Sequence, residues 1–261
     1  IIKCNNCGFK FTNPIPSENE IGSFYESDDY ISHSNTNKSL VDKIYQAVRR
    51  YTIKKKYNLV KRECNADSIL DVGSGTGEFL SYCNTKGLIS KGIEPSDSAR
   101  KLSIDNYKLD ISEESDLQNI KDNSVDAITM WHVLEHVYHL NERIETLKRI
   151  LKDSGAIFIA VPNCSSYDAK KYGKYWAAYD LPRHLYHFTP KDINSLMDKH
   201  GLQVKSILPM RFDSYYVSML SEKYRDGKSN IIKGFWSGLI SNIKASGKNE
   251  YSSQIYVIVK K

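Results

Sequence analysis

Apolar positions recur with two different periods along this chain. From Asp67 onward, short runs of consecutive apolar residues alternate with segments in which apolar residues return every three or four positions. The first pattern is typical of buried strands and the second of the helices that cover them. This alternation predicts an α/β fold with a doubly wound, seven-stranded, mostly parallel sheet whose last strand is antiparallel. The predicted strands are Ser68–Val72, Ile89–Glu94, Tyr107–Asp110, Ala127–Trp131, Ala156–Val161, Gln203–Pro209 and Gln254–Lys260, and the predicted helices are Glu78–Lys86, Ser96–Asp105, Leu134–Leu151 and Pro190–His200.

Further helical patterns lie before the first strand and before the last one. Lys38–Lys61 has apolar positions at helical spacing and predicts one long amphipathic helix, and Glu18–Tyr25 predicts a short helix capped by Ser17. Asp213–Asn249 is rich in aromatic residues, and we expect a helical insertion that acts as a lid, a substrate-binding cap or an oligomer contact. The predicted domains are a cysteine knuckle at 1–16, a helical cap at 17–65 and the main domain at 66–261.

The composition is that of a globular protein, with 40% hydrophobic and 26% charged residues among 261. No apolar run approaches the roughly 20 residues that a membrane-spanning helix needs. The net charge of +6 is densest between Arg49 and Arg62. We prefer to interpret this cluster as a solvated helix face and not as a nucleic-acid surface, because no RNA-binding signature accompanies it. Cys64, Cys83 and Cys164 stand singly, as reduced thiols do, and favour a cytoplasmic location.

A cysteine knuckle opens the chain. Cys4 and Cys7 form a C-x-x-C pair followed directly by Gly8, a spacing that suits tetrahedral zinc. Zinc needs four ligands, and only two are here. Because Ile1 is not an initiator methionine, we expect a longer protein in which an upstream cysteine pair completes a structural zinc ribbon. A metal-free turn and a redox dithiol remain the alternatives.

The stretch Ile69–Leu80 reads I-L-D-V-G-S-G-T-G-E-F-L and predicts a strand, a tight turn and a helix start. The spacing D-x-G-x-G-x-G differs from the G-x-G-x-x-G of dinucleotide sites, and no G-K-[ST] of a phosphate loop follows. An acidic residue such as Asp71 beside the turn suits a ligand that carries an ammonium group. Glu94 ends the next predicted strand, where a carboxylate can accept both hydroxyls of a ribose. The pattern therefore indicates a nucleoside-like cofactor with a cationic end.

Three stretches together resemble class I S-adenosylmethionine-dependent methyltransferases, which have a Rossmann-like fold. They are Ile69–Leu80, the G-I-E-P-S at 92–96 and the D-N-S-V-D-A-I-T-M-W-H-V-L-E-H-V at 122–137. Within that class they resemble the small-molecule branch, which includes ubiquinone-pathway O-methyltransferases and sugar C-methyltransferases. The resemblance implies a small-molecule acceptor and S-adenosylmethionine as cofactor. Residues expected to contact the cofactor are Asp71, Gly73, Ser74, Gly75, Gly77, Glu94, Pro95, Asp110, Ile111, Trp131 and His132, with Tyr30 folding over it.

Two histidine-bearing segments are candidates for the chemistry. A hydroxyl nucleophile needs a base, and histidine suits that task near neutral pH. His132 and the Glu135–His136 pair follow the fourth strand, where the segment is similar to the E-x-x-E-H that binds a divalent cation in ubiquinone-pathway enzymes, with His132 in place of the first glutamate. The loop at 179–190, Y-D-L-P-R-H-L-Y-H-F-T-P, provides His184 as the first choice for the base and His187 as the second, with Arg183 available for an anionic substrate group.

The sequence leaves other functions open. An RNA methyltransferase would agree with the positive charge and the zinc-like knuckle, although M-W-H-V replaces the N/D-P-P-Y/F of enzymes that methylate base amino groups. A cofactor-binding module without catalysis is the third possibility. Neither the acceptor, nor the methylated atom, nor the use of a divalent metal, nor the oligomeric state follows from the sequence.

Overall fold

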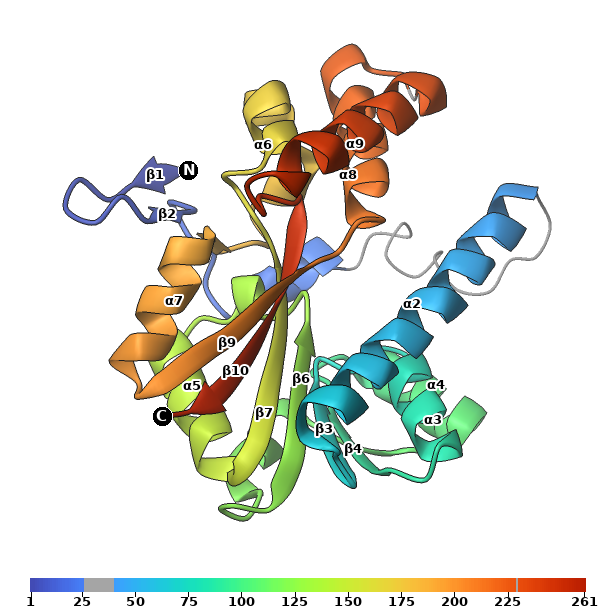
Figure 1. Ribbon diagram of the computed structural model, residues 1–261, viewed down its shortest axis with the longest axis vertical. Coiled ribbons are helices and arrows are strands. Elements are labelled where there is room, and N and C mark those ends of the chain that lie inside the picture. The colour runs from blue at the N-terminus through green and yellow to red at the C-terminus, as the bar shows by residue number, and fades with distance from the viewer. Residues whose placement is uncertain (26–39, 229) are drawn as a thin grey trace.

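The computed structural model describes residues 1–25, 40–228 and 230–261, and its centre is a seven-stranded sheet (Figure 1). The strand order is β5-β4-β3-β6-β7-β10-β9. The strands from β5 to β7 pair in parallel, whereas β10 runs antiparallel to both β7 and β9. The predicted fold class is confirmed. The strands are β3 (Ser68–Val72), β4 (Ile89–Ile93), β5 (Asp110–Ser112), β6 (Val125–Trp131), β7 (Leu151–Pro162), β9 (Leu202–Pro209) and β10 (Ser253–Lys260).

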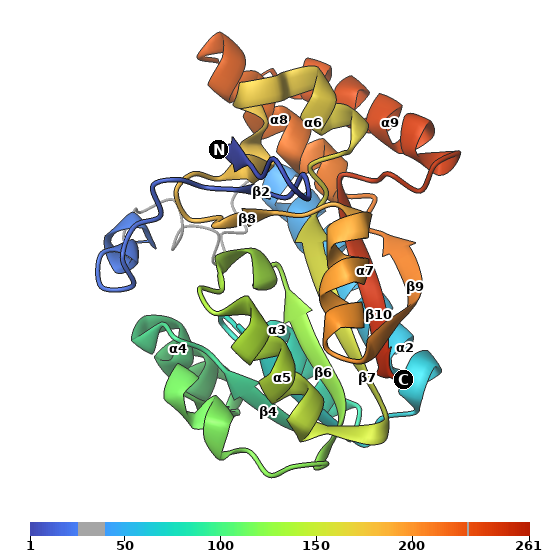
Figure 2. The ribbon, with the colours of Figure 1, turned by 90° about the vertical axis from the view of Figure 1, so that its left-hand side faces the viewer.

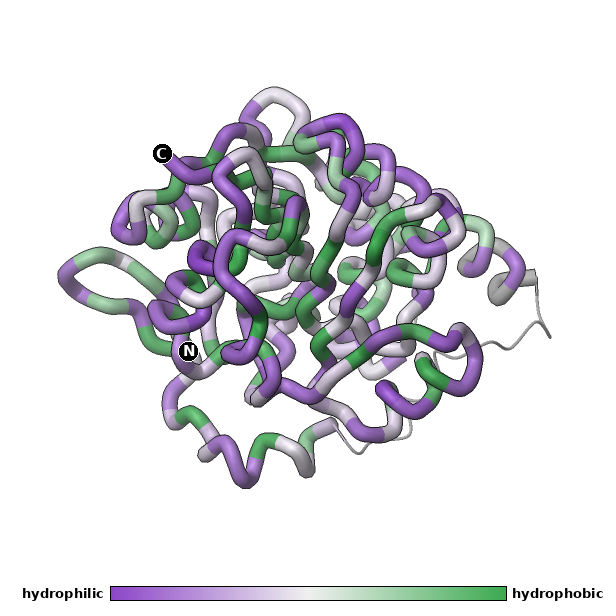
Figure 3. Tube along the Cα trace, turned by 90° about the horizontal axis from the view of Figure 1, so that it is seen from below, coloured by the Kyte–Doolittle hydropathy of each residue, from purple (hydrophilic) through white to green (hydrophobic). Residues whose placement is uncertain are grey.

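Helices cover both faces of this sheet, because each strand of the centre carries apolar residues on both sides. One core lies between the sheet and α5 and α7, where Ile144, Leu147 and Ile193 are fully buried. The other lies between the sheet and α2 and α3, around Val60 and Leu80. Hydrophobic stretches accordingly gather toward the middle of the molecule in Figure 3. The helices are α2 (Leu40–Cys64), α3 (Glu78–Thr85), α4 (Asp97–Tyr107), α5 (Leu140–Ile150) and α7 (Pro190–Lys199).

Two sequence predictions were wrong in detail. The predicted helix Leu134–Leu151 is a short 3-10 turn, Leu134–His136, followed by α5, because Val137–His139 is not helical. The predicted strand Tyr107–Asp110 begins only at Asp110, because α4 continues to Tyr107 and ends at Lys108 with φ +56°. Asp110 therefore begins β5 instead of ending it.

A roof of helices lies beyond the carboxyl ends of the parallel strands (Figure 2). It contains α6 (Tyr167–Tyr172), α8 (Asp213–Asp226) and α9 (Ile231–Ser246), of which the last two form the predicted helical insertion. Asp168 joins its parts, because its buried carboxylate accepts hydrogen bonds from Trp176, Ser241 and Ser252. The roof is therefore tied to the sheet through the start of β10.

The N-terminal segment adds a second, small sheet beside the roof. Strands β1 (Ile2–Lys3), β2 (Lys10–Phe11) and β8 (Tyr186–His187) pair in that order. Thr12 continues this contact, since its hydroxyl donates to the carbonyl of His184 at 2.6 Å. A 3-10 turn at Ile21–Tyr25 stands where a short helix was expected. The small sheet thus holds the histidine-bearing loop from its outer side.

Candidate functional site

The turn after β3 has the geometry that its glycines predict. Gly73, Gly75 and Gly77 have φ values of +74°, +55° and +83°, which disfavour any residue with a Cβ. A Cβ on Gly73 would lie 2.4 Å from Cγ2 of Val133. The N–H groups of Gly73 and Ser74 both donate to the carbonyl of Ile93, at 2.7 and 3.1 Å. The turn is therefore held against the end of β4.

Glu94 lies beside this turn. Its carboxylate accepts hydrogen bonds from the backbone N–H of Gly75 at 2.7 Å and of Ser96 at 2.9 Å. Burial raises the pKa of Glu94 although these hydrogen bonds lower it. The structure thus brings Glu94 to the glycine turn, as the sequence predicts for a residue that binds ribose hydroxyls.

Two features of the turn fit a bound nucleoside. A Cβ on Gly75 would meet nothing within 4 Å, so this glycine borders open space. The hydroxyl of Ser74 is buried and has no hydrogen-bond partner among the described residues. An unpartnered buried hydroxyl is costly unless a ligand or water completes it. The turn therefore borders open space at Gly75, which we call the cradle. The Ser74 hydroxyl lies beside Gly92 of β4, where a Cβ would be 2.9 Å from its oxygen.

A lysine whose role the sequence did not reveal, Lys56, acts electrostatically on Asp71. Lys56 of α2 places its Nζ 4.3 Å from the centroid of the Trp131 ring. Burial lowers the pKa of Lys56, while the nearby carboxylates of Asp71 and Asp213 raise it. Asp71 itself is buried, and burial raises its pKa to about 7 against the effect of the Thr129 hydroxyl and of Lys56. Lys56 was hidden in a basic cluster, but its position three residues after Ile53 and four before Val60 puts it on the apolar face of the helix.

The other residues predicted to contact the cofactor differ in burial and in their contacts. Ile111 is buried in β5, whereas Asp110 is exposed and forms an ion pair with Lys91 at 3.6 Å. Pro95 is exposed just after Glu94. Trp131 packs edge-on against Phe79 on the α2 side of the sheet. Tyr30 lies outside the described residues.

His132 occupies an unusual backbone position after β6, with φ +60°. Its Nε2 lies 3.0 Å from Asp213 of α8 and its Nδ1 lies 3.3 Å from Glu135. Burial alone would lower the pKa of His132, but the two carboxylates outweigh it and raise the pKa to about 10. A protonated His132 joins the sheet to the roof and has no lone pair for an acceptor proton.

His184 meets Glu135 and His136 beneath the roof. Their potential ligand atoms lie within 4.8 Å of one another. Nδ1 of His184 lies 2.9 Å from the carbonyl of Ala178, and a carbonyl can only accept, so this nitrogen carries the proton. Burial and the neighbouring His136 lower the pKa of His184 to about 4, which leaves a lone pair on Nε2. One carboxylate oxygen of Glu135, Oε2, is buried without a partner among the described residues.

His187, the second candidate base, lies apart from this cluster. It is buried, and its Nε2 lies 3.1 Å from the hydroxyl of Thr12, which itself donates to the His184 carbonyl. Burial lowers the pKa of His187 to about 3. The side chain thus connects β8 to the N-terminal segment, and its catalytic role remains a prediction.

Comparison with known proteins gives the family. The model of a family described as a methyltransferase domain matches residues 45–207, well over half of the chain. The chain belongs to this S-adenosylmethionine-dependent methyltransferase family. No curated protein matches the sequence.

Solved structures share the fold of this methyltransferase at low identity. A SAM-dependent methyltransferase from Archaeoglobus fulgidus is 19% identical, with a TM-score of 0.56 over 82% of this chain and 94% of that one. A putative sarcosine dimethylglycine methyltransferase from Galdieria sulphuraria is 14% identical, with 0.56 over 81% and 84%. Geranyl diphosphate C-methyltransferase from Streptomyces coelicolor A3(2) is 13% identical, with 0.60 over 88% and 84%.

The basic cluster of this methyltransferase is partly paired. Arg49 forms an ion pair with Glu78 at the start of α3, Arg62 pairs with Glu63 at 2.7 Å, and Lys61 donates to the carbonyl of Ala66 at 2.7 Å. Lys56 faces inward, whereas Arg50, Lys54 and Lys55 are exposed.

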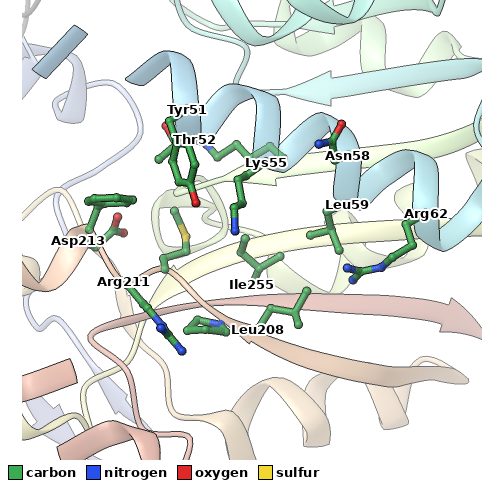
Figure 4. Close-up of a pocket in the computed structure, with 14 residues that line it drawn as sticks. Tyr51, Thr52, Lys55, Asn58, Leu59, Arg62, Leu208, Arg211, Asp213 and Ile255 are labelled. Carbon is green, nitrogen blue, oxygen red and sulfur yellow. The ribbon is translucent and has the colours of Figure 1, made fainter. Parts of the chain in front are cut away.

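A groove of about 730 Å³ separates α2 from the segment between β9 and α8. In Figure 4 Tyr51 and Lys55 reach into it from α2, opposite Arg211, Asp213 and Ile255. Because Asp213 contacts His132, the groove reaches the carboxyl edge of the sheet. No sequence motif pointed to it, since its walls come from distant segments.

The knuckle of this methyltransferase forms a tight turn. The N–H of Gly8 donates to the carbonyl of Cys4 at 2.9 Å, and Gly8 has φ +83°. Hydrogen bonds from the backbone of Cys7 and Asn6 lower the pKa of the Cys4 thiol. Within the described ranges no third histidine, cysteine or carboxylate joins Cys4 and Cys7. The half zinc site therefore remains a prediction.

Proposed function

We propose that this methyltransferase transfers the methyl group of S-adenosylmethionine to oxygen or carbon of a small-molecule acceptor in the cytoplasm. The observation that carries the proposal is His184, a neutral histidine beneath the roof whose Nε2 keeps its lone pair and lies 3.7 Å from Asp180 and 4.0 Å from Glu135. Such a base removes the acceptor proton as the nucleophile attacks the methyl carbon, and the sulfur leaves as a thioether.

The two acidic residues bind different parts of S-adenosylmethionine. Asp71, when ionised, holds the ammonium of the methionine part, and Glu94 accepts the ribose hydroxyls in place of the N–H groups that it now binds. Open space at Gly75 admits the cofactor to the backbone. Most of the rate then comes from alignment of the nucleophile with the methyl group, which the roof maintains by excluding other poses.

The same cluster also fits a divalent cation. The Nδ1 atoms of His136 and His184 lie 3.0 and 2.9 Å from backbone carbonyls, which leaves both Nε2 atoms for a metal, and Glu135 Oε2 is unpartnered in the described chain. Orientation of ligand histidines by carbonyls is common at metal sites. Glu135, His136 and His184 would hold the ion, which would acidify an acceptor hydroxyl.

Replacement of His184 tests the proposal. We expect His184→Ala to lower turnover about 100-fold or more, as loss of a general base does, with the dissociation constant for S-adenosylmethionine unchanged. His139→Ala is the matched control, because His139 is an exposed histidine. S-adenosylhomocysteine release from pools of small hydroxylated acceptors is the measurement, and unchanged turnover in His184→Ala would contradict the assignment.

Three further measurements separate the remaining alternatives. Activity lost on dialysis against a chelator and restored by a divalent cation would assign the cluster to a metal. Steeply salt-dependent RNA binding would favour an RNA methyltransferase, and tight cofactor binding without turnover on any pool would favour a non-catalytic module.

A further inference from the structure

Helix α9 buries its small residues and exposes its large apolar ones, which is the reverse of the usual pattern in a monomeric protein. Its large apolar side chains, which we call the α9 face, are exposed, with Ile232 72% and Trp236 56% accessible. An exposed apolar patch of this kind marks an interaction surface. The buried positions are Gly234, Ser237, Gly238, Ser241 and Ala245, whereas the α9 face consists of Ile231, Ile232, Phe235, Trp236, Ile240 and Ile243.

Close packing against α8 fixes this orientation. A Cβ on Gly234 would lie 2.5 Å from Met219 Cγ, and one on Gly238 would lie 2.7 Å from Tyr215 Cα. Only glycine allows the two helices to approach so closely, and a rotation that buried the large residues would drive them into the backbone of α8. The close packing of α9 against α8 therefore directs the α9 face away from the protein.

The charges of α9 itself have one sign, since the helix contains lysines and no acidic residue. Lys233 and Lys244 belong to the helix, Lys228 and Lys248 flank it, and all four are exposed. Asp226, just before the helix, pairs with Arg225 at 3.0 Å and with Lys233 at 3.7 Å, so one carboxylate offsets part of this charge. The surface thus combines apolar and aromatic side chains with a margin of lysines.

We propose that the α9 face docks on the surface of an anionic lipid bilayer. A helix with Trp, Phe and Ile on one side and lysines at its border lies in the membrane interface, and each lysine near an anionic surface adds to binding. A second copy of the chain fits less well, because an isologous antiparallel pair would place Lys233 of one helix near Lys244 of the other. The described helices include none long and apolar enough to cross a membrane.

Vesicle binding tests this proposal without any assay of methyl transfer. We expect the protein to co-sediment with phosphatidylcholine vesicles that contain about one third phosphatidylglycerol, and to bind pure phosphatidylcholine about tenfold or more weakly. Ile232→Ser/Trp236→Ser and, separately, Lys233→Glu/Lys244→Glu should each lower binding about tenfold or more. The matched control is Leu102→Ser/Ile104→Ser, which removes exposed apolar residues, 40% and 42% accessible, from α4.

Tryptophan fluorescence locates the contact. Of the three tryptophans, Trp236 is exposed, Trp176 is buried and Trp131 is half-buried against Phe79, away from α9. Brominated lipid should therefore quench the emission of Trp236 above all, and Trp236→Phe should abolish most of the quenching. All variants should retain S-adenosylmethionine binding, which shows that they fold. No binding to anionic vesicles would overturn the proposal. A dimer in solution that Ile232→Ser/Trp236→Ser dissociates, without vesicle binding, would assign the surface to a second copy instead.

Discussion

Two parts of the proposed site are held together by different contacts: the cofactor half, formed by the glycine turn, Asp71 and Glu94, and the acceptor half, formed by His132, His184 and the roof. In the cofactor half, the backbone N–H of Gly75 donates to the Glu94 carboxylate, 19 residues away. In the acceptor half, His132 contacts Asp213 and Asp168 contacts Ser252, and these side-chain partners are 81 and 84 residues apart. Backbone hydrogen bonds therefore hold the glycine turn to Glu94, although Asp71 accepts from Thr129, 58 residues away, whereas the proposed acceptor half depends on longer-range contacts between side chains.

Among the tests of this difference, Asp168→Ala should have the largest effect on stability. The change leaves Trp176, Ser241 and Ser252 as buried donors without their acceptor, at a cost of about 3 kcal/mol or more in the free energy of unfolding. For a chain of this size that lowers the melting temperature by roughly 6–12 °C.

The two halves should respond differently to Asp168→Ala. We expect turnover to fall steeply because the roof loosens, while S-adenosylmethionine still binds at temperatures where the protein is folded. Asp153→Ala, which removes a carboxylate that is 88% exposed, is the control. Equal loss of cofactor affinity and turnover would show that the halves are not separable.

The same difference explains what the sequence could predict. Most strands, the glycine turn and the position of Glu94 were predictable because each depends on neighbours in the chain and on the shared edge of a parallel sheet. The strand β5 was misplaced, because α4 continues to Tyr107. Lys56 and Asp213 were not, since each acquires its role only when α2 and α8 pack beside His132 and Asp71. His132 was predicted as cofactor-lining or basic, and Glu135 lies only three residues after it, yet its second carboxylate partner, Asp213, could not be predicted from the sequence.

Gly75→Ala probes the cofactor half alone. Gly75 and Gly87 both have positive φ values and open space where a Cβ would point, so alanine strains both equally, by about 1 kcal/mol. Only Gly75 borders the cradle. We expect Gly75→Ala to weaken S-adenosylmethionine binding about tenfold or more and Gly87→Ala to leave it unchanged. Calorimetric titration of both variants, with their melting temperatures, is the measurement, and equal affinities would remove Gly75 from the cofactor site.

The pH dependence of cofactor binding reports on Asp71. Its raised pKa, about 7, means that the side chain is protonated below that pH and cannot hold an ammonium group. Cofactor affinity should therefore fall about tenfold per pH unit below pH 7 and level off above it. Stability of the cofactor-free protein should change in the opposite sense, since an acid with a raised pKa favours the folded state less as pH rises from about 4 to 7. Asp71→Asn should remove the part of both dependences that Asp71 contributes and leave the part that comes from Glu94, whose pKa is also raised by burial.

The smallest effect should come from Lys56→Met, which keeps the length of the side chain and removes its charge. Lys56 lowers the pKa of Asp71, so its loss should raise that pKa and move the midpoint of the affinity curve upward by about half a unit to one unit. Lys55→Met, on the exposed side of α2, should leave the midpoint in place. A midpoint that stays fixed in Lys56→Met would contradict the electrostatic effect of Lys56 on the pKa of Asp71. Lys56 would then not connect the cofactor half to Asp213 of the acceptor half.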